Sequence, residues 1–184
     1  MKLKILPFAV MAAVAISGAI TACGDDDDDQ DNWKKYEQWR LDNQAYIDDM
    51  AAKKGADGKP LFTSITPSYN PAGTFLMRFI GDPAENADNL QPLYTSTATV
   101  NYTVHLYDGT RIDSAANYTS QLSSPSLISG WSETITRMHV GDSVESILPY
   151  NLAYGASGNT SVLPYSTLRF NIKLVDIPQY EVRP

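Results

Sequence analysis

The feature that most constrains the fold of this chain is a strict alternation of apolar and polar side chains in two distant segments, residues 100–106 and 168–174. A period of two places successive side chains on opposite faces of a strand, so each segment is predicted to be a half-buried β-strand. Residues 74–80 and 144–148 are shorter strand candidates, and residues 131–138 have the pattern of one short helix. Strands combined with a single short helix predict an antiparallel α+β domain.

Residues 33–55 precede this domain and are predicted to form an amphipathic helix that ends at Gly55. Two interpretations of its aromatic face stay open. The face could bind a carbohydrate or a partner protein, or it could pack on the following domain or on a second copy of itself. The packing interpretation is favoured, because an aromatic stripe at helical spacing is more often core than site. The turn-rich break at residues 56–60 predicts that residues 33–54 are dispensable for the activity of the domain. The side chains within one arc of the helix are Trp33, Tyr36, Trp39, Tyr46, Ile47, Met50 and Ala51.

The first 22 residues have the features of a secretory signal peptide. Lys2 and Lys4 lead into a largely apolar stretch, residues 5–20, which is shorter than the roughly 20 residues that a transmembrane helix needs. Ile-Thr-Ala and then Cys23, the only cysteine of the chain, follow in a pattern that resembles the bacterial lipobox. Cys23 is therefore predicted to be the lipidated first residue of a mature protein that is anchored to a membrane of the cell envelope.

Residues 23–32 are predicted to be an acidic tether. The tether contains five consecutive aspartates and is expected to be extended and solvated, because adjacent carboxylates repel one another. The aspartates also resemble the acidic export signals of lipoproteins at the outer membrane, so the protein is expected on the periplasmic or the surface face of that membrane. Loss of Lys2 and Lys4 with the signal peptide changes the net charge from −7 to −9. Such an acidic protein is not expected to bind nucleic acid.

The sequence offers few groups for covalent, metal or cofactor chemistry. Its two histidines, His105 and His139, have no cysteine or carboxylate partner at metal-ligand spacing. His105 lies on the strand face opposite Tyr102 and is interpreted as a surface residue. Residues 155–158 lack the lysine of a phosphate-binding loop, and no serine lies in a Gly-x-Ser-x-Gly motif. The sequence therefore predicts no metal site and no cofactor.

Five short motifs follow one another in the second half of the chain. They are VNYT at 100–103 with DGTRIDS at 108–114, LISGW at 127–131, MHVGD at 138–142, PYNLAYG at 149–155, and LP at 163–164 with TLRFNIKL at 167–174. In sequence and order they resemble the motifs of the FKBP-type peptidyl-prolyl cis-trans isomerases. The resemblance implies an α+β fold in which an antiparallel five-stranded sheet curls around one short helix, and it assigns the isomerase domain to residues 60–184.

The same resemblance implies the residues of the site. Trp131 would form the floor of an apolar pocket, and Asp113 would orient the site through hydrogen bonds. The backbone N–H of Ile128 and the hydroxyl of Tyr154 would bind substrate carbonyls. The implied partners are proline-containing segments of exported proteins and, as ligands of the same pocket, rapamycin-class macrolides. The implied catalytic residues are Tyr102, Asp113, Ile128, Trp131, Tyr154 and Phe170, and the implied substrate-binding residues are Ile112, Tyr118 and Leu127.

This reaction needs no titrating side chain. Rotation about an X-Pro amide faces a barrier of about 18–20 kcal/mol, because amide resonance is lost in the twisted geometry. The planar amide is the more polar state, so a dry aromatic pocket disfavours it relative to the twisted one. The binding energy from contacts to the proline and to the residue before it can then be used to twist the X-Pro amide out of its plane. A site without histidine or lysine suits this chemistry, whereas it would disable a hydrolase.

Two other functions stay open on the sequence alone. Ile112 stands where the family most often has phenylalanine, Asn159 stands where it often has histidine, and the segments 113–131 and 163–167 are short. These differences leave open a chaperone or binding module that keeps the FKBP fold but has weak or no isomerase activity. The aromatic helix leaves open a surface lipoprotein that binds a glycan or a partner.

Overall fold

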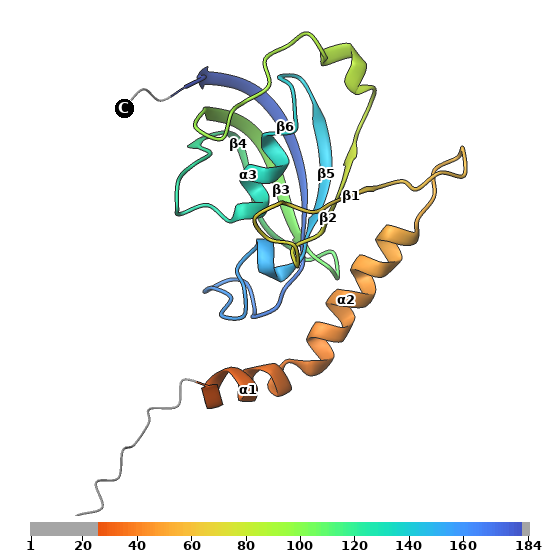
Figure 1. Cartoon of the computed structure of the whole chain (residues 1–184), viewed down its shortest axis with the longest axis vertical. Helices are drawn as coiled ribbons and strands as arrows, with labels where there is room; N and C mark the ends of the chain where they lie inside the picture. Colours follow the sequence, from red (N-terminus) through yellow and green to blue (C-terminus); the bar gives the residue numbers. More distant parts are fainter. Residues whose placement is uncertain (1–25, 182–184) are drawn as a thin grey trace, which may run out of the picture.

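The computed structural model describes residues 26–181, in which a curled β-sheet surrounds one short helix and two further helices lead into it (Figure 1). The predicted signal peptide, residues 1–22, and the predicted lipidation site at Cys23 lie outside the described residues. Among the helices of residues 26–181, none is both long enough and apolar enough to cross a membrane.

Six strands form one antiparallel sheet: β1 (Thr63–Ile65), β2 (Phe75–Phe79), β3 (Thr97–Leu106), β4 (Arg111–Gln121), β5 (Ser143–Leu148) and β6 (Leu168–Gln179). Their order in the sheet is β1-β2-β5-β6-β3-β4. The expected α+β class is confirmed, but the sheet has six strands rather than five because β1 pairs with β2. Strand β1 has no buried side chain, so it has no apolar pattern that would predict it. Two 3-10 turns complete the elements, at Pro83–Asn86 and Tyr150–Leu152.

Helix α3 (Ser129–Ile135) lies inside the curl of the sheet and forms the main core with it (Figure 1). The helix that was predicted at residues 131–138 thus begins two residues earlier and ends three residues earlier. Alternate side chains of β3 and β6, among them Val100 and Leu174, are buried in the same core as Trp131. The alternation in the sequence therefore correctly indicates which faces of these strands are buried.

Two helices precede the sheet, α1 (Asp26–Lys35) and α2 (Glu37–Ala52). The predicted single helix is divided at Tyr36, and residues 26–32, which were expected to be extended, are helical instead. Acidic residues are favoured in the first turn of a helix and basic residues in the last, because of the helix dipole. The sequence of α1, which begins with aspartates and ends with two lysines, follows this order.

The apolar face of α2 packs on the outer face of the sheet, on the side away from α3. Met50, near the end of α2, is 6% exposed and forms a second small core with Phe62, Leu76 of β2 and Ile147 of β5. Leu76 and Ile147 alternate along their strands with residues of the main core. Both faces of the β2–β5 pair are therefore covered.

The aromatic residues of α2 extend this contact along the helix. The ring centroid of Tyr107 lies 5.0 Å from that of Trp39 and 6.4 Å from that of Tyr46. The interpretation of the aromatic face as a packing surface is thus confirmed for these residues. It is wrong for Ala51, which is exposed, and Trp33 is still 46% exposed.

His105 lies on the outer face of β3 and is half-buried rather than exposed. Its Nδ1 atom is enclosed and has no hydrogen-bond partner among the described residues. The interpretation of His105 as a surface residue is therefore wrong. The physical reason is that the outer face of the sheet near Tyr107 is covered by α2, which sequence periodicity does not reveal.

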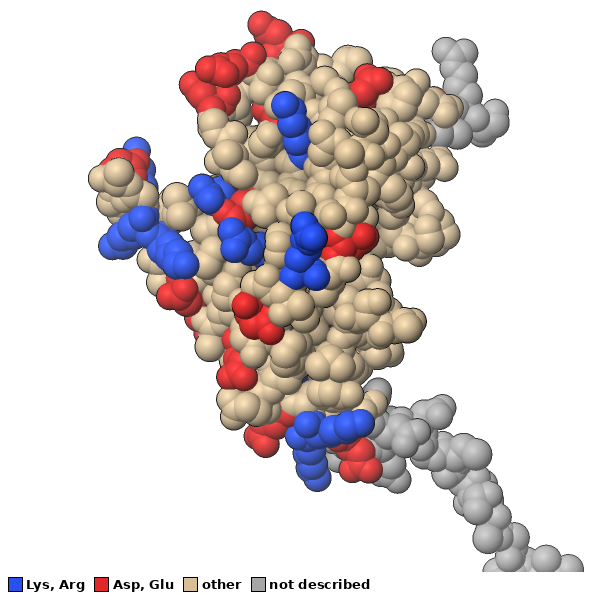
Figure 2. All heavy atoms as spheres, turned by 180° about the vertical axis from the view of Figure 1, so that it is seen from behind, with Lys and Arg blue, Asp and Glu red and all other residues tan. Residues whose placement is uncertain are grey.

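Charged side chains of both signs are interspersed over the face shown in Figure 2. One acidic side chain of the domain, that of Glu145 in β5, is buried and only 2% exposed. Its carboxylate oxygens lie 2.6 Å and 2.5 Å from the Nε atoms of Arg78 and Arg169. Two partners of opposite charge compensate for the removal of this carboxylate from water.

Candidate active site

A cavity of about 520 Å³ opens between α3, β3, β4, β6 and the loop that precedes β6. Ligand pockets in proteins commonly have volumes of roughly 300–1,000 Å³. All nine residues that the sequence assigns to the site line this one cavity. They are Tyr102, Ile112, Asp113, Tyr118, Leu127, Ile128, Trp131, Tyr154 and Phe170.

Trp131 is the centre of an aromatic cluster in the cavity. It comes from the first turn of α3 and is 4% exposed. Its ring centroid lies 5.1 Å from that of Tyr102, 6.0 Å from that of Tyr118 and 5.6 Å from that of Phe170, all in edge-to-face geometry. Edge-to-face packing is one of the two favoured arrangements of aromatic pairs. The Nε1 atom of Trp131 is buried without a hydrogen-bond partner in residues 26–181.

Tyr102 and Asp113 connect the neighbouring strands β3 and β4 at the wall of the cavity. The Tyr102 hydroxyl donates to Oδ2 of Asp113 at 2.6 Å, and the backbone N–H of Ser114 donates to Oδ1 at 2.8 Å. Burial raises the pKa of Tyr102 above its ordinary value, and the hydrogen bond to Asp113 raises it further. Tyr102 therefore keeps its proton and stays fixed against Asp113.

Two hydrogen-bond donors are available at the cavity. Ile128 is the N-cap of α3, and its backbone N–H donates to no described residue. Tyr154 is 40% exposed, and burial of its hydroxyl raises its pKa, with the negative charge of Asp113 as the second cause. A bound group with two carbonyl oxygens can therefore accept from one backbone and one side-chain donor, as the resemblance implies.

Six residues outside the predicted set also line the cavity. Val104 lies two residues beyond Tyr102, and Leu168 lies two residues before Phe170, so the strand alternation could have identified both. The other four lie in loops, where no periodic pattern indicates direction. They are Ser126, Asn159, Ser161 and Val162.

The lining residues contain no histidine, lysine or cysteine. Within residues 26–181, no group of three or more His, Cys, Asp or Glu side chains could hold a metal ion. Such a cavity can desolvate a bound group and fix its orientation. The fold and the site together define a class: an α+β domain with an aromatic pocket that can hold an apolar group and has hydrogen-bond donors beside it.

Comparisons with known proteins relate part of the chain to one family. The sequence profile described as FKBP-type peptidyl-prolyl cis-trans isomerase matches residues 90–175. The FKBP-type 22 kDa peptidyl-prolyl cis-trans isomerase of Escherichia coli strain K12 is 39% identical over 89 residues, which cover 47% of this chain and 43% of that protein. The macrophage infectivity potentiator of Trypanosoma cruzi is 32% identical over 110 residues, which cover 58% and 54%. A crystal structure of a peptidyl-prolyl cis-trans isomerase from Pseudomonas syringae pv. tomato superposes with a TM-score of 0.64 at 23% identity, covering 78% of this chain and 96% of that one.

Residues 90–175, just under half of the chain, match the FKBP-type peptidyl-prolyl cis-trans isomerase family. The chain spans about half the length of the curated relatives it matches. Helices α1 and α2 lie outside the residues that the family profile matches. The roles of the nine lining residues in a reaction remain predictions.

Proposed function

We propose that this protein is a peptidyl-prolyl cis-trans isomerase that acts on X-Pro bonds of exported polypeptides. The proposal is carried by one observation: all nine predicted residues line a single aromatic cavity. The match to the family supports the reaction type. Rapamycin-class macrolides are proposed as ligands that compete for the same cavity.

The proposed mechanism is desolvation and orientation without proton transfer. The proline ring of the substrate lies against Trp131, while the N–H of Ile128 and the hydroxyl of Tyr154 donate to substrate carbonyls. The aromatic walls remove water from the X-Pro amide, which disfavours the polar planar amide relative to the twisted one. The barrier that must be lowered is about 18–20 kcal/mol and arises from lost amide resonance.

The chain from residue 24 onwards, which lacks Cys23, is expected to accelerate isomerisation of an X-Pro peptide. In the same shortened chain, Tyr154→Phe should lower kcat/KM by less than about tenfold, because one neutral hydrogen bond contributes about 1 kcal/mol. A fluorescent X-Pro peptide assay measures the acceleration by the wild-type sequence and the loss in the variant. Tyr94→Phe is the control, because Tyr94 is 59% exposed and does not line the cavity. Absence of acceleration by the wild-type chain would overturn the proposal in favour of a binding module.

The isomerisation rate is expected to be flat between about pH 6 and pH 8. The pKa values of Tyr102 and Tyr154 are raised, mainly by burial, so both hydroxyls keep their protons throughout this window. Neither His105 nor His139 lines the cavity, so no imidazole is present there as an acid–base group. Stopped-flow rates across the pH range measure the profile. A bell-shaped profile centred near neutrality would contradict the mechanism and require an acid–base pair.

We also propose that Cys23 carries lipid and anchors the protein in the cell envelope, at the outer membrane. The support is the sequence of residues 1–23, in which the predicted signal peptide, residues 1–22, is followed directly by the only cysteine. Mass spectrometry of membrane-extracted protein should show cleavage after Ala22 and added acyl mass. Cys23→Ser should release the protein from the membrane fraction. An unmodified Cys23 or a retained signal peptide would refute lipidation.

A further inference from the structure

The loop of residues 159–167 lies between the cavity and the N-terminal helices. On one side, Ser161 and Val162 line the cavity. On the other side, three consecutive residues, 165–167, contact α1 and α2. The next residue, Leu168, begins β6 and lines the cavity again. A shift of residues 165–167 would therefore displace the cavity wall both before and after them.

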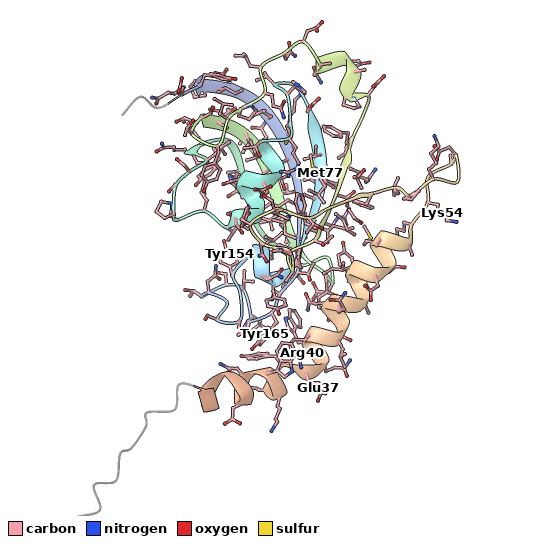
Figure 3. All side chains as sticks on the ribbon, in the orientation of Figure 1. Glu37, Arg40, Lys54, Met77, Tyr154 and Tyr165 are labelled. Atoms are coloured by element: carbon pink, nitrogen blue, oxygen red, sulfur yellow. The ribbon has the colours of Figure 1, made fainter. Side chains whose placement is uncertain are left out.

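Tyr165 is held between the helices and the domain. Its side chain is 4% exposed, and its ring centroid lies 5.4 Å from that of Trp33 and 6.4 Å from that of Tyr36. Cζ of the Arg40 guanidinium lies 5.8 Å from the centroid of the Tyr165 ring, and Figure 3 shows the Arg40 and Tyr165 side chains close together. From the domain side, the ring of Tyr150 lies 5.3 Å away. The aromatic contacts from both sides fix the position of the loop.

The backbone of Tyr165 adopts a left-handed conformation, with φ 61°. Bulky residues rarely occupy this region, and they persist there only when surrounding contacts hold them. The contacts with Trp33 of α1 and with Tyr36, which lies between α1 and α2, supply part of that restraint. The loop conformation therefore depends on residues outside the loop itself.

Hydrogen bonds from α2 reach the next two loop residues. Nε1 of Trp39 donates to Oγ of Ser166 at 3.2 Å. The backbone N–H of Thr167 donates to Oδ1 of Asn43 at 2.7 Å, and Nδ2 of Asn43 donates to the Trp39 carbonyl oxygen at 2.7 Å. Asn43 and Thr167 are each 2% exposed. Since Asn43 satisfies a buried backbone N–H, its loss would leave that donor unpaired.

We propose that α1 and α2 are a positioning element of the active site, which holds the loop 159–167 in the shape that forms one wall of the cavity. Asn43 and Trp39 are the positioning residues, because they contact the loop and do not line the cavity. The inference rests on the proposed isomerase function. It assigns a role in substrate binding to residues that precede the family match at residue 90.

The test compares full chains that carry Asn43→Ala or Gln44→Ala with the wild type in the X-Pro assay. Gln44 is the matched control, an exposed amide on the same helix whose side chain bonds Asp48. Asn43→Ala should raise KM on the order of fivefold with little change in kcat, because a displaced wall weakens binding of substrate and transition state equally. A purely structural role would instead lower the folded fraction, and with it kcat, at unchanged KM.

Two further measurements keep the test decisive. Asn43→Asp, assayed at pH 6, should restore KM, because burial keeps a carboxyl protonated and the acid then offers the same donor and acceptor as the amide. Amide exchange of Thr167, followed by NMR, should accelerate in Asn43→Ala even if the wild type proves inactive, so failure of the isomerase proposal is distinguishable. If Asn43→Ala does not fold, Trp39→Phe removes the donor to Ser166, keeps an aromatic ring beside Tyr107, and should still raise KM. Unchanged KM and unchanged exchange, or an equal effect of Gln44→Ala, would overturn the inference.

Discussion

Replacing Trp131 by alanine is expected to lower the free energy of unfolding by about 3–5 kcal/mol and to remove the proposed isomerase activity at the same time. Trp131 is 4% exposed and contacts the rings of Tyr102, Tyr118 and Phe170. Its truncation leaves a cavity in the main core and takes away the surface against which the substrate proline is proposed to lie. Urea unfolding measures the stability, and the X-Pro assay on the folded fraction measures the activity.

Trp131→Phe is the matched control for this prediction. The substitution keeps an aromatic ring at the floor and removes an indole N–H that is buried without a partner among the described residues. An unsatisfied buried donor costs about 1–3 kcal/mol, so its removal should offset part of the lost packing. The phenylalanine variant should therefore be more stable and more active than the alanine variant. Wild-type stability and activity in Trp131→Ala would show that this residue is not the floor.

Met50→Ala is expected to destabilise the protein by about 2–5 kcal/mol, although Met50 lies before the domain that the family profile matches. Met50 is 6% exposed and packs with Leu76 and Ile147, both nearly inaccessible to solvent. Leu41→Ala, on the same helix, is the control, because Leu41 is 55% exposed and such substitutions usually change stability by less than about 0.5 kcal/mol. Thermal and urea unfolding measure both variants. Equal effects of the two substitutions would mean that α2 does not pack on the sheet as described.

The packing of α2 changes what is expected of a shortened chain. The turn-rich break at residues 56–60 and the position of the first motif predict that residues 33–54 are dispensable. A glycine-containing turn shows where one element ends, but it does not show what the apolar face of that element covers. Removal of α2 would expose Leu76 and Ile147 and would take away the partner of the Thr167 N–H. A chain that begins near Gly58 is therefore expected to be less stable and to bind its substrate less tightly.

The local alternation of apolar and polar side chains was sufficient to predict the central strands. The alternation at residues 100–106 and 168–174 lies within β3 and β6, and its apolar faces are buried in the main core. Strand β4 has mostly exposed side chains and no such pattern, and its conformation follows from pairing with β3. Strand β1 is likewise defined by its pairing with β2. Strands whose side chains stay in solvent depend on backbone pairing, which the sequence pattern does not record.

The sequence by itself determined the nine predicted residues of the cavity, through short motifs that resemble those of the FKBP-type family; eight of the nine lie within these motifs, and Tyr118 lies outside them. Only the tertiary structure decided that Ser161 and Val162 complete the wall and that α2 holds their loop in place. The decisive contact, from Thr167 to Asn43, joins residues 124 positions apart. The local sequence around Asn43 or Thr167 does not predict this contact, because the path of a loop is set by the surfaces on which it packs in the folded protein.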